Sequence, residues 1–377
     1  MEDLKRGEVV MKRGFRIRIY PNKEQEVQCI DYCSAFRYIY NYMLEYQFLN
    51  HKFGGKYLRP YNMYNLLTKI RQDSPWLNSI NVATLRGACD DLHLAFRWYF
   101  EKVANLPKFK SKKYGKQIFA VRTDRTRFIS VNTIRISGIG NVRYKTNYNF
   151  TNFCGKLFNP RVSKVGNKWF LTFTIGYDSQ VANGKKDSMG IDLGIKTLAV
   201  VSHNNEIIKF HNINKSKKMR NLERRIKHTQ REIARKQLDS KNRLKARKIY
   251  QRLCRKQSNI RLNYTHQITR QLVNRKPERV VMEKLNVMGM MKNKYLAHAV
   301  IGQNFYEFRR QMQYKCEWAG IEFVLADRFY PSSKTCSNCG NIKHSLRLKD
   351  RTYICDKCGS ILDRDENAAI NLQRYVV

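Results

Sequence analysis

Two closely spaced cysteine pairs in the C-terminal region constrain the fold of the chain more than any other feature. Cys336 and Cys339 are separated by two residues, as are Cys355 and Cys358, and 15 residues lie between the pairs. Two thiolates in each tight turn, with the two turns brought together, give the closed tetrahedral site that Zn²⁺ prefers. A glycine directly after each pair frees the backbone to curl its amides around the sulfurs. The spacing therefore predicts a zinc ribbon with a structural role, rather than disulfides or a redox motif.

The charge balance points to a polyanionic partner. The 377 residues include 73 Lys and Arg against 30 Asp and Glu, which gives a formal net charge of +43. Self-repulsion at this level opposes a compact state unless a polyanion neutralises it. Nucleic acid fits best, because each neutralised phosphate also releases counterions. A membrane surface is the competing partner, but no apolar run approaches the ~18 residues of a spanning helix and no secretory leader is evident.

Composition further indicates folded domains in a reducing compartment. Hydrophobic residues make up 42% of the chain and aromatic residues 12%, which is enough to build cores. The length predicts two or three domains of ~150 residues each. Six further cysteines are scattered among apolar or helical residues: Cys29, Cys33, Cys89, Cys154, Cys254 and Cys316. We expect these to be buried free thiols in a soluble, cytoplasmic protein.

The first half of the chain has the periodicity of a β-rich domain interrupted by helices. Residues 14–20 alternate apolar and basic side chains as a strand does, and Pro21 ends the run. Apolar residues then recur at spacings of three and four, which predicts two helices with buried stripes. The stripes are Tyr32, Phe36, Ile39, Met43 and Tyr46, then Leu85, Cys89, Leu92, Phe96 and Tyr99. Further strands are expected at 128–131, 133–136, 142–145 and, as a hairpin, over 162–177.

After a polar, Gly-containing linker at 181–188, strands alternate with helices. An apolar strand is predicted over 190–202, turning into 207–210, and buried strands are predicted at 279–283 and 321–326. Residues 215–256 hold 18 Lys and Arg on an apolar seam, with three acids. This pattern favours one or two long helices with a basic outer face.

Two basic segments are candidates for nucleic-acid contact. One is this helical region, and the other is the loop 108–116 (KFKSKKYGK), in which aromatic residues are interleaved with lysines. A solvated surface is the alternative, but so basic a chain favours phosphate contact. The candidate residues are Lys108, Lys110, Lys112, Lys113, Arg224, Arg225, Arg231 and Arg235.

Acids are scarce, so acids within apolar strands stand out. Asp192 lies inside an apolar strand, where burying an unpaired charge costs several kcal/mol. Glu283 ends another apolar strand, and Asp363 and Asp365 lie at the predicted start of the final helix. Carboxylates delivered by two strand ends and a helix can hold a pair of Mg²⁺ ions ~3.5–4 Å apart, which activate water and stabilise the leaving oxygen of a phosphodiester. Pairing with a basic residue explains any single acid, but jointly they predict a nuclease site.

Five motifs follow one another in the second half of the chain: 190–199 (GIDLGIKTLA), 282–285 (MEKL), 331–340 (PSSKTCSNCG), 355–359 (CDKCG) and 363–371 (DRDENAAIN). Their order resembles that of the TnpB (OrfB) family of insertion-sequence proteins, which are RNA-guided nucleases related to type V CRISPR effectors. The chain resembles this family with specific motifs from about residue 189 to 372. In the N-terminal half the resemblance is weaker, and includes Tyr40-Asn41 and residues 107–110.

The resemblance implies an α/β multidomain fold. It consists of a wedge-like β-barrel (1–22 and 106–180) with a helical recognition insert (23–105), the linker, and a RuvC-like nuclease domain of RNase H fold (189–330 and 361–377) carrying a zinc ribbon (331–360). The implied catalytic residues are Asp192, Glu283 and Asp365, with Asp363 as the alternative in the last motif. They would bind two catalytic Mg²⁺, and the four cysteines would bind one structural Zn²⁺.

The resemblance also implies an activity and partners. A TnpB-like protein is expected to bind a guide RNA from its own element and to cut matching double-stranded DNA beside a short recognition motif. It would act in a prokaryotic cytoplasm, associated with the nucleoid, as a monomer or weak dimer. Three alternatives stay open: a guide-independent transposase or DNA-binding protein, a nuclease-inactive RNA-guided repressor, and a non-enzymatic RNA-binding protein.

Overall fold

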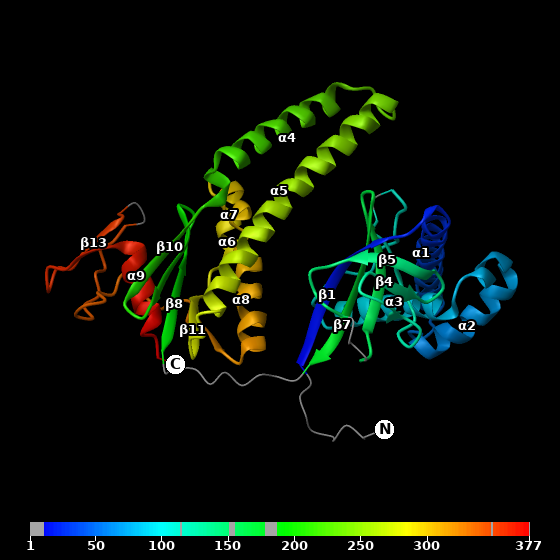
Figure 1. Cartoon of the computed structure of the whole chain (residues 1–377), viewed down its shortest axis with the longest axis horizontal. Coiled ribbons are helices and arrows are strands. Elements are labelled where there is room, and N and C mark those ends of the chain that lie inside the picture. The colour runs from blue at the N-terminus through cyan, green and yellow to red at the C-terminus, as the bar shows by residue number, and fades with distance from the viewer. Residues whose placement is uncertain (1–10, 114, 151–154, 178–186, 348–349, 377) are drawn as a thin grey trace, which may run out of the picture. The chain divides into compact units, whose positions relative to one another are not determined.

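The chain divides into two units, residues 1–178 and 179–377, and each has its own hydrophobic core (Figure 1). The computed structural model describes residues 11–113, 115–150, 155–177, 187–347 and 350–376. Most of the linker expected at 181–188 lies outside these ranges, as does Cys154. Within them, no helix is long and apolar enough to cross a membrane.

A seven-stranded antiparallel sheet forms the centre of the first unit, in the order β2-β6-β7-β1-β5-β4-β3. Its strands are β1 (Met11–Tyr20), β2 (Gln117–Ala120), β3 (Arg127–Phe128), β4 (Thr133–Ile136), β5 (Gly140–Lys145), β6 (Phe158–Val165) and β7 (Lys168–Tyr177). Phe15 on β1 lies opposite Phe173 on β7, and Ile17 opposite Leu171, and all four side chains are buried. The alternation predicted for β1 and the hairpin predicted over 162–177 are confirmed.

The described part of this sheet is open, which differs from the expected closed barrel. The edge strands are β2 and β3, and no ladder between described residues joins them. β3 contains two residues and β2 four, so neither edge offers the run of backbone groups that closure requires. The strand predicted at 128–131 is thus shorter than expected and covers residues 127–128.

The helical insertion lies between β1 and β2, as predicted. It contains α1 (Lys23–Lys52), α2 (Pro60–Asp73), the 3₁₀ helix η1 (Pro75–Ser79) and α3 (Val82–Phe100). A capping box starts α1, because the Asn22 side chain accepts from the Gln25 amide at 2.8 Å and the Gln25 side chain accepts from the Asn22 amide at 3.1 Å. The predicted stripes are buried except at their last members, Tyr46 near the end of α1 and Tyr99 in the last turn of α3, which are exposed.

The second unit is built on a five-stranded sheet in the order β10-β9-β8-β11-β12. Its strands are β8 (Ser188–Leu193), β9 (Thr197–His203), β10 (Glu206–His211), β11 (Arg279–Glu283) and β12 (Glu322–Ala326). The first three form an antiparallel meander, and β8, β11 and β12 are parallel. The single strand predicted over 190–202 is wrong, because a tight turn after Leu193, in which Gly194 donates to the Leu198 carbonyl at 3.2 Å, divides it into β8 and β9.

Helices cover both faces of this sheet. The helices are α4 (Lys217–Arg235), α5 (Lys241–Val273), α6 (Val287–Met291), α7 (Ala297–Gln303), α8 (Phe305–Ala319) and α9 (Arg364–Gln373). One face packs on α5 and α8, with Met189, Ile191 and Met282 in a shared core. The other face packs on α9, where Leu372 meets Val281. Strand alternation thus assigns Asp192 and Glu283 to the α9 face.

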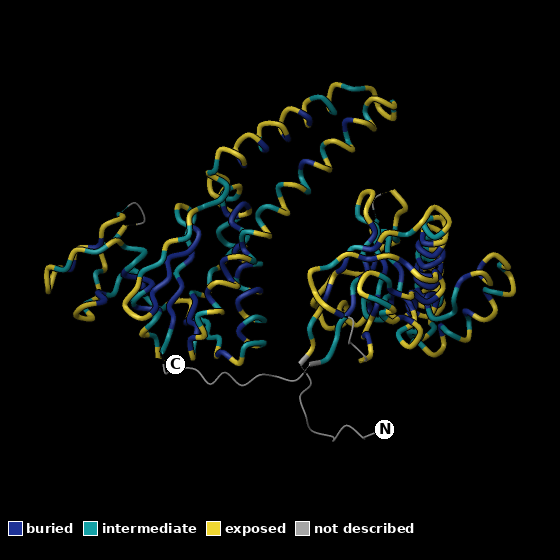
Figure 2. Tube along the Cα trace, viewed as in Figure 1, coloured by how far each residue is buried: buried dark blue, intermediate teal, exposed yellow. Residues whose placement is uncertain are grey.

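The predicted basic region forms a helical hairpin of α4 and the first part of α5, whose tip extends away from the sheet (Figure 1). Asp239 has a left-handed backbone (φ 61°) and the Ser240 side chain caps α5, so the chain turns here instead of forming one helix. Met219, Leu222, Ile226 and Leu253 make a small core of their own. Most other residues of this helical hairpin are exposed and are drawn in yellow in Figure 2.

Candidate functional site

Asp192 and Glu283 come from neighbouring parallel strands. Met282 pairs with Ile191, so the next residue on each strand is one of the two acids. Because alternate residues of a strand share a face, both carboxylates lie on the side covered by α9, and both are half-buried. The sequence singled out these two acids because each lies inside or at the end of an apolar strand. The structure shows that they are neighbours on one face of the sheet.

The first turn of α9 contributes a third acid, Asp365. This helix lies directly against β8 because residue 190 is glycine: a Cβ there would overlap the Ala369 carbonyl oxygen and the Gln373 amide. The Gln373 side chain also contacts the Ser202 hydroxyl, which donates at 2.5 Å. These contacts hold the second half of α9 against β8 and β9. Asp365, in the first turn of the same helix, lies close enough for its charge to act on Asp192, and we call Asp192, Glu283 and Asp365 the acid cluster.

The electrostatics connect the other two acids to Asp192. Burial raises the pKa of Asp192 well above its usual range, and the charges of Glu283 and Asp365 raise it further, whereas Arg364 lowers it. Burial also raises the pKa of Glu283, again opposed by Arg364. A bound cation relieves such mutual repulsion, and carboxylate oxygens are the donors that Mg²⁺ accepts. Among the described residues, however, no carboxylate group gathers as closely as the cysteines below.

Asp363, the alternative in the last motif, has a different role in the structure. Its side chain caps α9 by accepting from the amides of Asp365 at 2.9 Å and Glu366 at 3.2 Å. It also lies 3.8 Å from the Lys209 ammonium, which pairs with Glu366 at 2.6 Å. The charge of Asp363 also raises the pKa of Asp192, after that of Asp365 in size, and Asp365 lies 3.7 Å from the Arg364 guanidinium. Asp363 therefore has a helix-capping role that Asp365 lacks, and we group Asp365 with the two strand acids.

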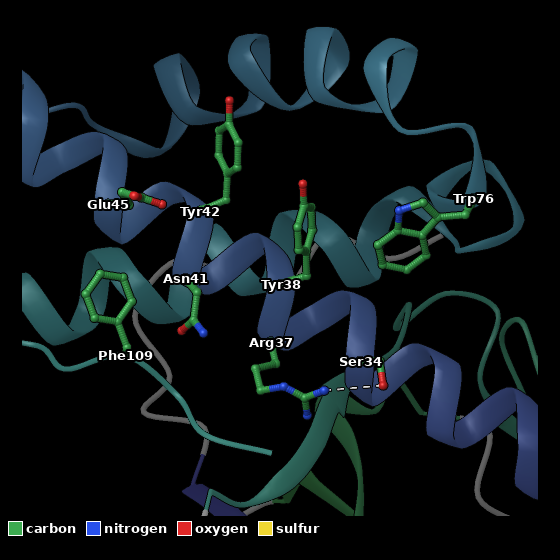
Figure 3. A pocket seen from close by; sticks show the side chains of 8 residues that line it. All are labelled: Ser34, Arg37, Tyr38, Asn41, Tyr42, Glu45, Trp76 and Phe109. Atoms are coloured by element: carbon green, nitrogen blue, oxygen red, sulfur yellow. Dashed lines mark hydrogen bonds between the residues drawn. The ribbon is translucent and has the colours of Figure 1, made fainter. Parts of the chain in front are cut away.

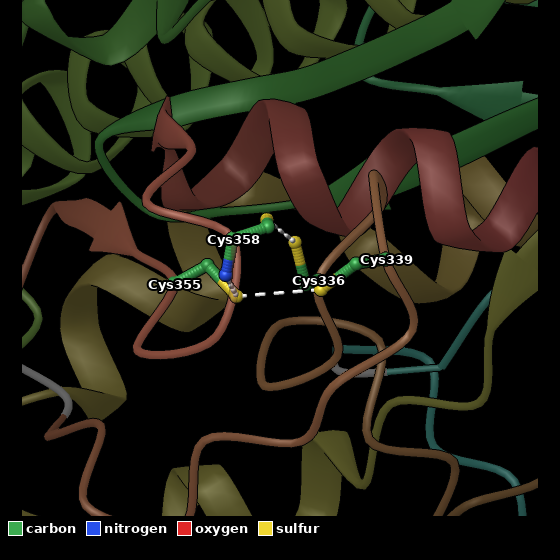
Figure 4. Close-up of side chains that lie close together, drawn as sticks. All are labelled: Cys336, Cys339, Cys355 and Cys358. Atoms are coloured by element: carbon green, nitrogen blue, oxygen red, sulfur yellow. Dashed lines mark hydrogen bonds between the residues drawn. The ribbon is translucent and has the colours of Figure 1, made fainter.

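The four predicted cysteines form one cluster, the cysteine cluster (Figure 4). Their sulfurs all lie within 4.8 Å of one another, with Cys336 3.7 Å from Cys358 and Cys339 3.5 Å from Cys355. Four sulfurs bound to one Zn²⁺ at ~2.3 Å lie ~3.8 Å apart, so the donor set fits this metal. The glycines that follow each pair, Gly340 (φ 75°) and Gly359 (φ 71°), adopt the left-handed conformation that the two turns require.

Two buried asparagines of α9 connect the cysteine cluster to the acid cluster. Asn367 donates to the Thr335 carbonyl at 2.7 Å and accepts from the Ser337 amide at 2.9 Å, on either side of Cys336. Asn371 donates to the same carbonyl at 2.6 Å and to Ser332 at 2.7 Å. Sequence reasoning missed this role, although two asparagines one helical turn apart beside small apolar residues were a signal of buried hydrogen bonding.

Most of the predicted nucleic-acid contacts lie on the surface. Lys108, Lys112 and Lys113 of the basic loop and all four arginines predicted on α4 are exposed. Lys110 differs, because its ammonium lies 3.5 Å from the centre of the Tyr40 ring and 3.8 Å from Asp91. Burial lowers the pKa of Lys110 to about 8. This lysine serves the packing of α1 and is not on the surface that the prediction assumed.

The scattered cysteines are mostly the inert thiols that the sequence predicts. Cys29, Cys33, Cys89 and Cys316 are buried, and burial raises the pKa of each to about 12. Cys254 on α5 is half-buried. Buried thiols with a pKa this high stay protonated at neutral pH, so these four cysteines are inert.

Three family descriptions match separate parts of the chain. Residues 173–294 match "Probable transposase" (OrfB_IS605), residues 305–372 match "Cas12f1-like, TNB domain", and residues 11–56 match "Helix-turn-helix domain" (HTH_OrfB_IS605). In this structure the helix-turn-helix match covers one strand and one long helix, β1 and α1. The TNB-domain match spans α8, the cysteine cluster and most of α9.

Whole-chain comparisons agree with these matches. The chain is 29% identical to a Streptomyces pristinaespiralis protein named "Putative RNA-guided DNA endonuclease", covering 96% of this chain and 89% of that protein. It is 27% identical to InsQ of Escherichia coli K12, which has the same description, over 96% and 92%. Its fold is similar to a chain in a cryo-EM structure of the Cas12f1–sgRNA–target DNA complex, with a TM-score of 0.58 at 14% identity over 97% and 99%. Together with the ordered motifs, these findings show that the chain belongs to the TnpB (OrfB) family.

Proposed function

We propose that this protein is an RNA-guided, Mg²⁺-dependent DNA endonuclease. The observation that carries the proposal is the acid cluster: Asp192, Glu283 and Asp365 come from two adjacent strand ends and a helix start, and their charges interact. Such a cluster raises the energy of the fold unless it binds cations, because each charge is disfavoured by its neighbours and by burial. A functional requirement explains why a chain with so few acids places three of them together.

The acid cluster would hold two Mg²⁺ ions, which when bound supply an activated water and stabilise the leaving oxygen of the phosphodiester. The chain's own contribution is to position the three carboxylates. The parallel register of β8 and β11 fixes the first two, and the packing of α9 on Gly190 fixes the third. Arg364 lowers the pKa of both strand acids and so favours their charged, metal-binding form.

The cysteine cluster would hold one structural Zn²⁺. All four positions of a tetrahedral site are filled by protein sulfurs, which leaves none open for substrate. The ion would fix the two turns, and through Asn367 and Asn371 it would fix α9 as well. We therefore assign residues 331–360 to a zinc ribbon that supports the nuclease domain.

The remaining domain assignments follow the family resemblance. The sheet order β10-β9-β8-β11-β12, with an antiparallel meander followed by parallel strands, supports a RuvC-like RNase H fold for 189–330 and 361–377. The seven-stranded sheet would be the wedge-like domain, and residues 23–105 the recognition insert. The relatives' description as RNA-guided DNA endonucleases supports a guide RNA and target DNA as partners.

In this proposal the guide RNA selects the target sequence by base pairing. The protein provides a positively charged channel and recognises a short motif beside the target. The net charge of +43 suits a protein that must neutralise an RNA and a DNA duplex together. We expect the protein to act as a monomer or weak dimer in a prokaryotic cytoplasm, in association with the nucleoid.

Reconstitution tests the proposal. The full chain, a structured RNA from its own element and Mg²⁺ are incubated with plasmids that do or do not contain the guide-matched sequence. We expect cleavage only of the matching plasmid and only with RNA. Strand joining without RNA would show a guide-independent transposase instead, and tight guided binding without cutting would show a repressor.

A further inference from the structure

A hollow lined by aromatic side chains lies on the helical insertion of the first unit. It has a volume of about 480 Å³ and is bounded by α1, by Trp76 of η1 and by Phe109 of the basic loop (Figure 3). Tyr38 and Tyr42 project from one face of α1, one turn apart. The volume falls within the ~300–1,000 Å³ typical of ligand sites, and the acid cluster makes no use of it.

The aromatic residues of this hollow are partly open to solvent. Their exposed fractions are 38% for Tyr38, 37% for Tyr42, 48% for Trp76 and 55% for Phe109. The Tyr38 ring lies 5.5 Å from the Trp76 ring at 66° and 6.1 Å from the Tyr42 ring at 43°. The Tyr38 ring thus meets Trp76 edge to face and is tilted against Tyr42, and all three rings keep more than a third of their surface exposed. A gathered set of open aromatic faces is a surface on which another flat ring can stack.

The polar groups of the hollow match a nucleotide. The Arg37 guanidinium donates only weakly, to Ser34 at 3.4 Å and to Gln117 at 3.5 Å, and no described carboxylate lies within 4.0 Å of it. Gln117 also donates to the Lys112 carbonyl at 3.0 Å, which places the exposed part of the basic loop beside Arg37. Glu45 adds an acceptor at the other end of the same helix face. Cationic donors thus lie at one end of the aromatic surface, and an acceptor lies at the other.

We propose that this aromatic hollow binds an unpaired nucleotide of a single-stranded nucleic acid, with the base stacked on Tyr38, Tyr42 or Trp76. Arg37 and the neighbouring lysines would contact the phosphate, and Glu45 would accept from an amino group on the base edge. Charge complementarity decides the occupant, since a chain of charge +43 that places an unneutralised guanidinium beside open rings favours a phosphate-bearing aromatic ligand. The proposal rests on the proposed function only in that the protein binds nucleic acid, and it does not require cutting.

Photo-crosslinking tests the position of the base. Twelve-nucleotide single strands of RNA and of DNA, each with 5-iodouracil at a single site, are irradiated with the full-length protein in buffer without Mg²⁺, and the modified peptides are identified by mass spectrometry. We expect adducts at Trp76, Tyr38 or Tyr42. Comparison of the RNA strand with the DNA strand shows which of the two nucleic acids binds in the hollow. Adducts that fall elsewhere in both arms would overturn the proposal.

Affinity measurements on variants separate stacking from charge. Tyr38→Ala and Trp76→Ala should each weaken single-strand binding by about 5- to 150-fold with an unchanged salt dependence. Tyr38→Phe and Trp76→Phe, which keep a ring, should bind like the wild type. Arg37→Gln should instead reduce the slope of log affinity against log salt by about 0.7. Trp98→Ala is the matched control, because Trp98 is exposed to 43% on α3 but does not line the hollow.

These measurements do not depend on catalysis, so binding with the expected variant pattern would stand even if no guided cleavage were found. Equal affinity of the alanine variants, the phenylalanine variants and Trp98→Ala would overturn the proposal. So would a loss of self-association, seen by analytical ultracentrifugation in Tyr38→Ala without any loss of oligonucleotide binding, because the hollow would then be a contact between copies of the chain.

Discussion

At the scale of single residues, the two aspartates of the last motif divide their roles between chemistry and folding. Asp365→Ala should abolish cutting, because it removes a carboxylate of the acid cluster. Asp363→Ala should cost about 0.5–2 kcal/mol of stability through loss of the α9 cap. Asp363→Asn, which can still cap the helix, should keep both stability and cutting. Cleavage assays and denaturant unfolding check this, and an inactive Asp363→Asn beside an active Asp365→Ala would reverse the assignment.

The acid cluster also predicts how stability depends on pH and metal. The folded-state pKa of Asp192 is raised, so the native protein binds a proton that the unfolded chain has lost. Stability therefore falls as pH rises from the ordinary carboxyl pKa near ~4 through the raised value. In Mg²⁺-free buffer, Asp192→Asn should lack this loss and melt higher than the wild type at neutral pH.

The measurement is the Tm of both proteins across pH, with and without Mg²⁺. Added Mg²⁺ should raise the Tm of the wild type and reduce its difference from Asp192→Asn, because a ligand that binds only the native state stabilises it. Val200→Ala, a change in the buried strand that pairs with Asp192, is a control for altered packing. Identical pH profiles of wild type and Asp192→Asn would contradict the interaction of the acids.

At the scale of elements, the ribbon and α9 act as one piece. Zn²⁺ binding by small modules is coupled to their folding, on the order of 10 kcal/mol. Cys336→Ser or Cys355→Ser should release zinc, displace α9 and slow cutting, while guide RNA still binds. Asn367→Ala should keep zinc, but it leaves the buried Ser337 amide unpaired at a cost of about 1–3 kcal/mol, while Asn371 still donates to the Thr335 carbonyl. Because it loosens the contact between α9 and the ribbon, it should also slow cutting.

The rival account is a ribbon that only grips nucleic acid through Lys334, Lys343, Arg347 and Lys349. Lys343 does not fit it, since its ammonium donates to Asp356 at 2.7 Å and to the Ile354 carbonyl at 3.0 Å, and Lys349 lies outside the described residues. Single-turnover cleavage at saturating protein distinguishes the two accounts, together with zinc content by mass spectrometry. A normal rate in Asn367→Ala and in the zinc-free cysteine variants would refute the coupling.

The helical hairpin of α4 and α5 yields a second prediction at this scale. Changing Arg224, Arg225, Arg231 and Arg235 to Gln should weaken RNA binding at low salt and reduce its salt slope, by about 0.7–0.9 for each arginine that contacts a phosphate. Lys227→Gln is a control on the same helix, because Lys227 already pairs with Glu223 at 3.0 Å. Filter binding across salt concentrations measures the slope, and an unchanged slope in the quadruple variant would show that this face is only solvated.

At the scale of the whole molecule, the sequence predicted individual strands and helices better than it predicted whether a sheet closes or where a strand turns. Short-range periodicity determined β1, the hairpin over 162–177 and the stripes of α1 and α3, because each depends on neighbours a few residues away. Whether β2 meets β3, and where 190–202 bends, depends on pairing between distant segments. Likewise, the sequence marked Asp192 and Glu283 by their apolar surroundings, but the contact of Asn367 with the ribbon became visible only when α9 was packed on it.

The most direct test of the central claim is single-turnover cleavage of a guide-matched DNA duplex by wild type, Asp192→Asn and Glu283→Gln, each saturated with guide RNA and Mg²⁺. The account predicts cutting by the wild type. It predicts rates lower by more than about a hundredfold in both variants, because a metal ligand matters at least as much as the groups that orient it. RNA and target binding should persist in both variants, since that affinity comes mainly from Lys and Arg. Cutting by Asp192→Asn at the wild-type rate would contradict the account.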